Sequence, residues 1–513
     1  MGTKQPLDDC LSIQDGHLYI EGQDCVDLIN TFGSPLFVFS EDQLRRNVRR
    51  FKESFSAGWT AGPVKVMPAA KANWNLAVQR VLADEGCGCD IYSPGELDIA
   101  FRAGFEPRYI SVNGVPKSED HIRRTIQCGA RLTIDSVEEI DLIEKVAKEL
   151  AQTAYVRIRL RPTLTEFTDP SDFSAEGKVP TDVVAMAYKG GLSFDEVMAY
   201  APRIMAMDHV EVTGFHEHHG RHSRTTAYWR AQMKAYAREI GMVCKELDGF
   251  KPREIDVGGG FAIPRDPFNA ATDYNTPRDL NRLNKVSRIL QAVLPGKRYP
   301  VLQKLMEGVS ATPNQIPAPT IEEYAEAVTS TLLEELPKHG VDPEGIMLQL
   351  EPGRSLHGNT GIHLTTIQAI KNAQAPLKWK HVITDTTEFW FTGGRYEHHL
   401  HDYRIANKAD APFTQKVDVC GRSCYGDRIM PFIYIPEVEV GDIFAMLDTG
   451  AYQEVSCSNF NAMPRPASIL VKGRDAHVIR RAETLEDVFN RDVVPEHLVS
   501  LRAPENDELV KDR

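Results

Sequence analysis

Cysteine spacings typical of disulfide frameworks are missing from this sequence. Its nine cysteines are scattered over 513 residues and include no Cys-x-x-Cys pair. In a chain of this length, scattered thiols fit a reduced protein better than a disulfide-stabilised one. We therefore expect a cytoplasmic location and exclude a small secreted scaffold.

Long apolar segments and an excess of positive charge are lacking as well. No run of about 18 apolar residues occurs, which predicts no transmembrane helix. The start of the chain holds no apolar segment of the kind that signal peptides carry. The formal net charge is −13, which repels the phosphates of nucleic acids and of anionic membranes. We expect neither a nucleic acid nor a membrane as a partner.

The remaining composition is that of a globular protein, with 42% hydrophobic and 26% charged residues. From Ser34 to Leu356, short apolar runs alternate with amphipathic runs and give about eight strand–helix units. This rhythm predicts an α/β fold, a (β/α)8 barrel, with a doubly wound sheet as the competing topology. The barrel is favoured because polar, glycine-rich clusters recur where strands end, which is where barrel enzymes carry their chemistry.

After Ser355 the sequence changes to short strands and turns, which predicts a second, β-rich domain. We expect N-terminal strands in residues 1–35 that join this β domain, the barrel in residues 36–357, and a β-barrel or sandwich in residues 358–513. Residues from about 266 to 318 form an insertion that is long for a barrel connection. We interpret it as an active-site lid or an oligomer contact.

Three groups of residues follow predicted strands and could carry chemistry. Lys71 lies in "MPAAKANWN", where a lysine can form a Schiff base with an aldehyde, although most such lysines are surface residues. Gly258–Gly260 in "DVGGGF" let backbone N–H groups approach a phosphate, or form a flexible loop. Glu351 and Arg354 in "LEPGRS" could hold a protonated ring nitrogen and a phosphate, or form an ordinary ion pair.

The stretch "FHEHHGRHS" is ambiguous. Side chains alternate along a strand, so His216 and His218 are predicted to face the same way. Two histidines at this spacing could bind a metal, and one imidazole could instead stack on a flat cofactor ring. Both could also be solvated or core residues.

Eight motifs occur in a consistent order along the chain: "AAKAN", "GCDIYSPGEL", "FHEHHG", "DVGGGF", "EPGRS", "VCGRSCYGD", "DTGAY" and "NFN" followed by "RP". Together they resemble the fold-type III pyridoxal-phosphate decarboxylases, and within that family the diaminopimelate decarboxylases. The resemblance implies a barrel with a β domain and a carboxy-lyase that uses pyridoxal 5'-phosphate. It also implies an amino-acid substrate, no bound metal, and a homodimer with active sites at the subunit interface.

The resemblance implies a role for each residue that matches the family pattern. Lys71 matches the lysine that binds the cofactor covalently, Asp90 the acid that supports it, and His218 the histidine that stacks on the ring. Glu351 matches the partner of the ring nitrogen. Cys424 matches the cysteine that enters from the other subunit and returns a proton to the substrate. The residues matching phosphate contacts are Gly258, Gly259, Gly260, Arg354 and Tyr452, with Arg221 standing where the family commonly has serine.

The chain departs from the family pattern in its substrate segment. Tyr425 stands where diaminopimelate decarboxylases have a glutamate that binds the substrate's distal amine, and a neutral phenol supplies no such charge. Arg395 and Tyr396 could contact a distal carboxylate. The expected substrate-binding residues are therefore Arg395, Tyr396, Cys424 and Tyr425, and the substrate is expected to differ from meso-diaminopimelate.

Three other hypotheses stay open on the sequence. A racemase or epimerase of the same family would use Lys71 opposite Cys424 or Tyr425 as bases. A metal-dependent hydrolase would use His216 and His218 as ligands. A non-catalytic homologue would bind and regulate a true decarboxylase, although such a role needs neither Lys71 nor Glu351.

Overall fold

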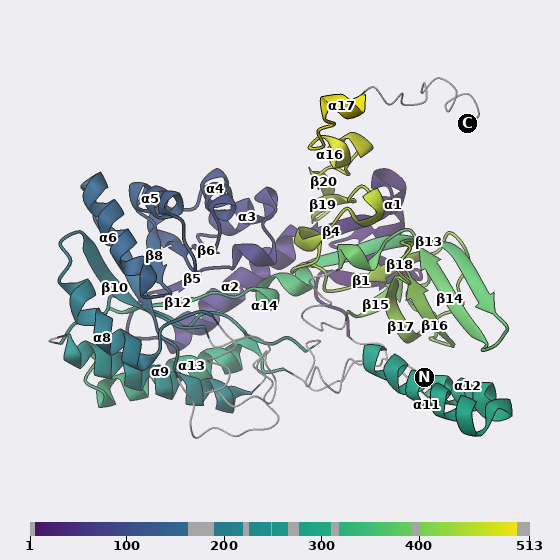
Figure 1. Cartoon of the computed structure of the whole chain (residues 1–513), viewed down its shortest axis with the longest axis horizontal. Helices are drawn as coiled ribbons and strands as arrows, with labels where there is room; N and C mark the ends of the chain where they lie inside the picture. The colour runs from purple at the N-terminus through teal and green to yellow at the C-terminus, as the bar shows by residue number, and fades with distance from the viewer. Residues whose placement is uncertain are drawn as a thin grey trace.

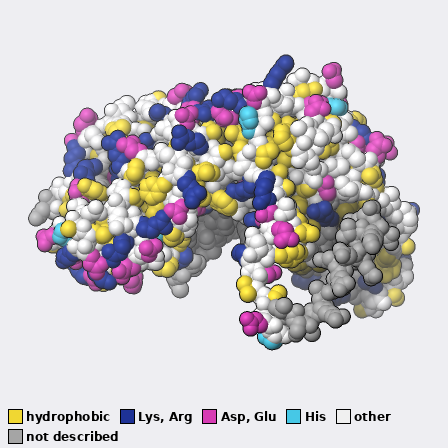
Figure 2. All heavy atoms as spheres, turned by 90° about the horizontal axis from the view of Figure 1, so that it is seen from above, with side chains coloured by type: hydrophobic (Ala, Val, Ile, Leu, Met, Phe, Trp, Pro, Cys, Tyr) yellow, Lys and Arg dark blue, Asp and Glu magenta, His cyan; other side chains and the backbone are white. Residues whose placement is uncertain are grey.

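The structure is a computed structural model in which a helix-covered barrel lies beside a β-rich domain (Figure 1). It describes residues 6–162, 189–218, 225–247, 249–264, 276–308, 318–391 and 401–499, with the backbone alone for residues 276–282 and 499. No helix in these ranges is long and apolar enough to cross a lipid bilayer. On the face that Figure 2 shows, lysine and arginine side chains are interspersed with acidic ones.

Eight parallel strands form a nearly closed barrel, as the sequence predicted. They pair in the order β5-β12-β11-β10-β9-β8-β7-β6. Gly88 N donates to Val66 O at 2.8 Å and Asp90 N donates to Pro68 O at 3.1 Å, which brings the two edge strands together. The strands are β5 Val64–Val66, β6 Cys89–Ile91, β7 Ile110–Val112, β8 Arg131–Ile134, β9 Ala154–Arg159, β10 Val210–His216, β11 Glu254–Asp256 and β12 Met347–Leu350.

Helices cover the outside of the barrel because each has one apolar face. In α2, Leu44, Val48, Phe51 and Phe55 follow one another at helical spacing and are all buried. Ser40 begins this helix, since its hydroxyl oxygen accepts a hydrogen bond from Gln43 N at 2.9 Å. The covering helices are α2 Glu41–Gly58, α3 Leu76–Asp84, α4 Pro94–Ala103, α5 Glu119–Cys128, α6 Glu138–Leu150, α8 Phe194–Met205, α9 Thr226–Glu246 and α13 Ile321–Lys338.

The β domain contains one strand that the sequence reading assigned to the barrel region. β4 (Leu36–Ser40) lies between β13 and β19 in the sheet β17-β16-β14-β13-β4-β19-β20. All five of its residues are buried, and an entirely apolar strand has the same pattern in a barrel and in a covered sheet. The other strands are β13 Gly361–Ala373, β14 Trp379–Thr384, β15 Tyr403–Ile405, β16 Gln415–Cys420, β17 Arg428–Ile435, β18 Ile443–Met446, β19 Ala467–Lys472 and β20 Asp475–Arg480.

The N-terminal strands form a small sheet of their own. β1 (Leu11–Gln14), β2 (His17–Ile20) and β3 (Gln23–Asp24) pair antiparallel and are followed by α1 (Cys25–Phe32). Their buried side chains share a hydrophobic core with β13 and β18 of the β domain. The N-terminal strands therefore join the β domain by packing. Three further short helices are α14 (Arg354–His357), α16 (Leu485–Phe489) and α17 (Glu496–Val499).

The described part of the insertion is a helical hairpin that docks on the β domain. It consists of α11 (Thr276–Val293) and α12 (Arg298–Gly308), and it leaves the barrel between β11 and α13 (Figure 1). Lys416 Nζ donates to Met306 O at 3.1 Å and to Glu307 O at 2.8 Å, near the C-terminal end of α12. Gln303 exchanges hydrogen bonds with the backbone of Lys378. These hydrogen bonds attach the hairpin, which is inserted in the barrel sequence, to the β domain.

Candidate active site

The predicted site residues Lys71, Asp90 and Glu351 lie at or near the ends of barrel strands. Lys71 lies in a short 3-10 turn after β5, and Asp90 lies within β6. Lys71 Nζ is 3.9 Å from Asp90 Oδ2, and the lysine side chain is 54% exposed whereas that of Asp90 is 7% exposed. A primary amine is therefore open to a ligand on one side and faces a buried acid on the other.

Glu351, directly after β12, is held by residues from two other strands. Asn113 Nδ2 donates to Glu351 Oε1 at 2.7 Å, and His216 Nε2 lies 3.2 Å from Glu351 Oε2. Burial and the neighbouring Asp90 raise the pKa of Glu351 to about 7, against the opposing effects of Arg157 and Lys71. Glu351 can therefore hold or release a proton near neutral pH.

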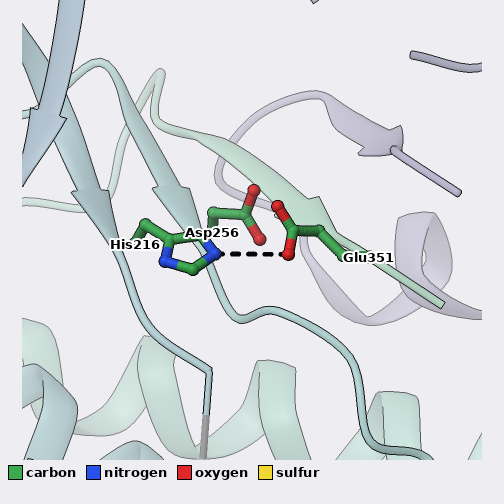
Figure 3. Close-up of side chains that lie close together, drawn as sticks. All are labelled: His216, Asp256 and Glu351. Atoms are coloured by element: carbon green, nitrogen blue, oxygen red, sulfur yellow. Dashed lines mark hydrogen bonds and ion pairs between the residues drawn. The ribbon is translucent and has the colours of Figure 1, made fainter. Parts of the chain in front are cut away.

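A second buried acid, Asp256 at the end of β11, lies next to Glu351. Figure 3 shows His216, Asp256 and Glu351 directed toward one another. One possible metal-ligand atom of each residue lies within 4.8 Å of those of the other two. Burial and Glu351 raise the pKa of Asp256 to about 7, and burial lowers the pKa of His216 to about 3. Arg157 Nη1 donates to Asp256 Oδ2 at 2.6 Å. A fixed positive charge is therefore already paired with one of the three side chains.

His218 does not lie with His216. Its Nδ1 accepts a hydrogen bond from Gly259 N at 3.2 Å, whereas His216 contacts Glu351. Beyond the end of β10 the regular strand alternation no longer holds, so the two imidazoles make different contacts. The metal-hydrolase hypothesis required both histidines at one ion, and this geometry does not support it.

The glycine loop after β11 is built for close backbone contact. Gly258 has a φ of +65° and Gly260 a φ of +100°, which disfavour other residues. A Cβ on Gly259 would lie 2.3 Å from the backbone oxygen of Glu351. Gly258 N donates to Asp256 Oδ1 at 2.9 Å. These glycines therefore fix the positions of Asp256 and His218 as well as bordering the site.

Arg354, which follows the last barrel strand, and Tyr452 of the β domain lie together at the open end of the barrel. Arg354 is 6% exposed, and its guanidinium carbon lies 5.0 Å from the centroid of the Tyr452 ring. Tyr452 N donates to Ala72 O at 2.7 Å, next to Lys71. A Cβ on Gly353 would lie 2.4 Å from Tyr452 Oη. The site therefore has one wall from each domain.

Cys424 and Tyr425 are exposed on the loop between β16 and β17. Asp427 fixes this loop by accepting from Ser423 N at 2.7 Å and from Glu388 N at 2.5 Å. Cys424 N donates to Asn461 Oδ1 at 3.1 Å. The thiol is thus presented outward on a loop of defined shape. The predicted residues Arg221, Arg395 and Tyr396 lie outside the described part of the chain.

Sequence reasoning missed Asn113, Arg157 and Asp256, which bind the predicted residues together. Asn113 follows the strand "ISV", so the strand-end rule that selected Lys71 would also have selected it. Arg157 lies inside β9, where the alternation of "AYVRIR" places a charge in the barrel interior. The sequence alone does not indicate which residues an arginine inside a strand will contact.

A ligand-accessible lysine beside a buried acid, a protonatable glutamate, a glycine loop and a buried arginine together define a site for an aldehyde cofactor that carries a phosphate. The fold and this site are those of a pyridoxal-phosphate enzyme. Residues 41–292 match the family model described as pyridoxal-dependent decarboxylase, pyridoxal binding domain.

Individual relatives agree with the family model over nearly the whole chain. A diaminopimelate decarboxylase of Archaeoglobus fulgidus is 30% identical, covering 95% of this chain and 100% of that protein. One of Methanocaldococcus jannaschii is 29% identical over 96% of this chain and 98% of that protein. Its crystal structure in complex with L-lysine has a TM-score of 0.78, covering 96% of this chain and 99% of the other. The chain belongs to the pyridoxal-dependent decarboxylase family and is a carboxy-lyase that uses pyridoxal phosphate.

The residues present fit this cofactor. Arg354 supplies a buried cation for a phosphate, whereas the N–H groups of Gly258 and Gly259 already donate to Asp256 and His218. Lys71 supplies the amine, and Glu351 can carry the charge that a ring nitrogen needs opposite it. An amine for the aldehyde, an acid for the ring nitrogen and a cation for the phosphate are therefore all present.

The close contact of Gly259 predicts that alanine is not tolerated there. In Gly259→Ala the new methyl group meets the backbone oxygen of Glu351 at 2.3 Å, so the loop and the glutamate must move apart. We expect a loss of ~1–3 kcal/mol in the free energy of unfolding, measured in urea, and weaker cofactor binding. Gly296→Ala is the control, because no heavy atom lies within 4 Å of its new Cβ. Equal stability of the two variants would show that the contact is unimportant.

Proposed function

We propose that this chain decarboxylates an α-amino acid, with Lys71 as the residue that binds the cofactor and Glu351 as the partner of the cofactor's ring nitrogen. The observation that carries the proposal is the pairing of two groups near the ends of barrel strands. The exposed amine of Lys71 lies 3.9 Å from the buried carboxyl group of Asp90. When bound, pyridoxal phosphate supplies an electron-accepting ring that takes up the electron pair left by departing CO2. Burial of Glu351 keeps its proton available near neutral pH.

The other residues of the site are proposed to hold the cofactor in place. His218, fixed by Gly259 N, would lie against the ring face, and Asp90 would orient the amine of Lys71. The proposed phosphate contacts are Gly258, Gly259, Gly260, Arg354, Tyr452 and Arg221. Arg354 and Tyr452 support this assignment because they already lie together at the domain junction.

Cys424 is proposed to return the proton after CO2 leaves, acting in the site of a second copy of the chain. Its S–H bond would break as a C–H bond forms on the substrate carbon, and the thiolate would regain a proton from water. The outward presentation of Cys424 on a fixed loop supports a role across a subunit interface. The active assembly is therefore proposed to be a homodimer.

The substrate is proposed to lack the distal ammonium group of diaminopimelate. Tyr425 is 59% exposed, and its ring lies 5.8 Å from that of Phe389 in an edge-to-face arrangement. Phe389 stacks on Phe460 at 4.0 Å. These three rings form an aromatic surface beside Cys424, and none supplies the carboxylate that an ammonium group would need. Arg395 and Tyr396 remain proposed contacts for a distal carboxylate.

Replacement of Lys71 tests the proposed reaction. The purified protein should absorb at the long wavelength of lysine-bound pyridoxal phosphate, and Lys71→Ala should lose that band. Release of CO2 from a panel of amino acids should fall more than about 100-fold, because the covalent attachment site is gone. Lys65→Ala is the control, since Lys65 lies on β5, and its amine donates to Gly86 O at 2.8 Å and lies 3.8 Å from the centroid of the Tyr109 ring, outside the candidate site. An unchanged spectrum in Lys71→Ala would refute the assignment.

A mixing experiment tests the role of Cys424 across the interface. Lys71→Ala and Cys424→Ala should each be poorly active, the second by about 100-fold or more if the thiol is the proton donor. Coexpressed, they should form hybrid dimers with one complete site, restoring about a quarter of wild-type activity. No recovery, with hybrid dimers verified by mass, would show that Cys424 does not complete a partner's site.

A charge at position 425 tests the substrate proposal. Tyr425→Glu should raise kcat/KM for meso-diaminopimelate about tenfold, because one ion-paired hydrogen bond is worth ~1.5 kcal/mol. Tyr425→Phe keeps the ring and should leave that value unchanged. If the wild-type protein already prefers meso-diaminopimelate over every other amino acid tested, the proposed difference in substrate is wrong.

A further inference from the structure

One buried amide lies between the two acids nearest the reactive groups of the site. Asn113, 6% exposed, follows β7. Its Nδ2 donates to Asp90 Oδ1 at 2.7 Å and to Glu351 Oε1 at 2.7 Å. A single NH2 group therefore uses both of its hydrogens on carboxyl groups from two different barrel strands.

The orientation of this amide follows from its other contacts. Asn113 Oδ1 accepts from Ser111 Oγ at 3.3 Å and from Arg157 Nη2 at 3.5 Å. Rotating the amide by 180° would place its oxygen against two carboxyl groups and its hydrogens against the guanidinium of Arg157. The network thus allows only the orientation in which both acids receive a donor.

We propose that Asn113 is a positioning residue that holds Asp90 toward Lys71 and Glu351 toward His216, and that it lets both acids carry charge a short distance apart. The proposal rests on the proposed function, in which these two acids serve the cofactor's amine and its ring nitrogen. Like-charged groups in a buried site repel each other, and donors placed between them offset that repulsion.

The electrostatic surroundings show why an amide is needed there. Glu351 is faced by Asp90 from β6, Arg157 from β9, His216 from β10, Asp256 from β11 and Lys71 after β5, with the Cys89 thiol also near. Asp90 is faced by Lys71 and Glu351, and by Glu96 of α4. The hydrogen bond from Asn113 lowers the pKa of Glu351 against the larger effect of burial. Removing it should leave Glu351 with a higher proton affinity.

The pH dependence of stability in the cofactor-free protein provides the test. The pKa of Glu351 in the folded state, about 7, exceeds the ordinary value of roughly 4.3. Its contribution to stability is therefore complete at low pH and is lost as pH rises through about 7. Asp256 titrates with the same sign and keeps its partner Arg157 in every variant. Buried histidines, among them His216 with a pKa lowered to about 3, contribute with the opposite sign below about pH 6.5, so the quantity compared is the melting temperature of each variant minus that of the wild type at each pH.

Asn113→Leu keeps the number and branching of the side-chain heavy atoms and removes both donors. We expect its deficit in melting temperature relative to the wild type to grow as pH rises from about 7 to about 8, because a tenfold rise in the proton affinity of Glu351 extends that group's loss of stability by about one pH unit. Asn113→Asp keeps the shape and adds a third carboxyl group, so its shift should be larger. In the cofactor-loaded protein, Asn113→Leu should weaken pyridoxal phosphate binding about tenfold, measured by equilibrium dialysis.

Asn47→Leu is the matched control. The amide of Asn47 also donates two hydrogen bonds, to Leu356 O at 2.7 Å and Asn359 Oδ1 at 2.8 Å, but neither acceptor is a carboxylate. This variant should lower the melting temperature equally at all pH values. If both Asn113 variants behave as Asn47→Leu does, Asn113 is merely structural and the inference is wrong. Failure of the wild-type protein to bind pyridoxal phosphate would instead refute the proposed function, whatever the pH profiles show.

Discussion

The rest of the site depends on the hydrogen bonds and the positive charge of the buried Arg157 guanidinium. It is fully buried and donates to Asp256 at 2.6 Å, to Gln349 at 2.7 Å and to Thr133 at 3.1 Å, and it lies 4.0 Å from Glu351. An uncompensated charge in a protein interior costs several kcal/mol. A cation at the centre of the barrel therefore makes it possible for several acids to face the same small space.

Burial and the neighbouring charges determine which side chains of the site are protonated. Glu351 and Asp256 both have a pKa near 7, because burial raises it and Arg157 opposes the rise, and the buried His216 stays neutral. A neutral imidazole beside Glu351 can donate to the carboxylate without adding a second positive charge. Of these three side chains, only the two carboxyl groups therefore gain or lose a proton near neutral pH. In the proposed function Glu351 faces the ring nitrogen of the cofactor, and an acid with a pKa near 7 can pass a proton to such a group at neutral pH.

The residues that sequence analysis predicted are those that follow strands, because the ends of parallel strands meet at one edge of the barrel. Lys71, Glu351 and the glycine loop were found in this way. Asn113 also follows a strand and was overlooked, whereas Arg157 could not be found, because its partners Asp256 and Gln349 lie 99 and 192 residues away along the chain. β4 was placed in the barrel region because burial on both faces erases the alternation that would distinguish the two sheets. The docking of the insertion hairpin depends on Lys416, which no local pattern connects to it.

The two domains divide the work of the site in a way that explains how its substrate can differ from that of its relatives. The charges that control protons are enclosed in the barrel, where each is tied to several neighbours and a change at one alters the others. The loop that presents Cys424 and Tyr425 belongs to the β domain and is fixed by its own acid, Asp427. The contacts that fix this loop involve none of the acids at the end of the barrel. With Tyr425 in its proposed role as a substrate contact, a substitution there would change which amino acid is accepted while the protons of Glu351 and Asp256 stay where they are.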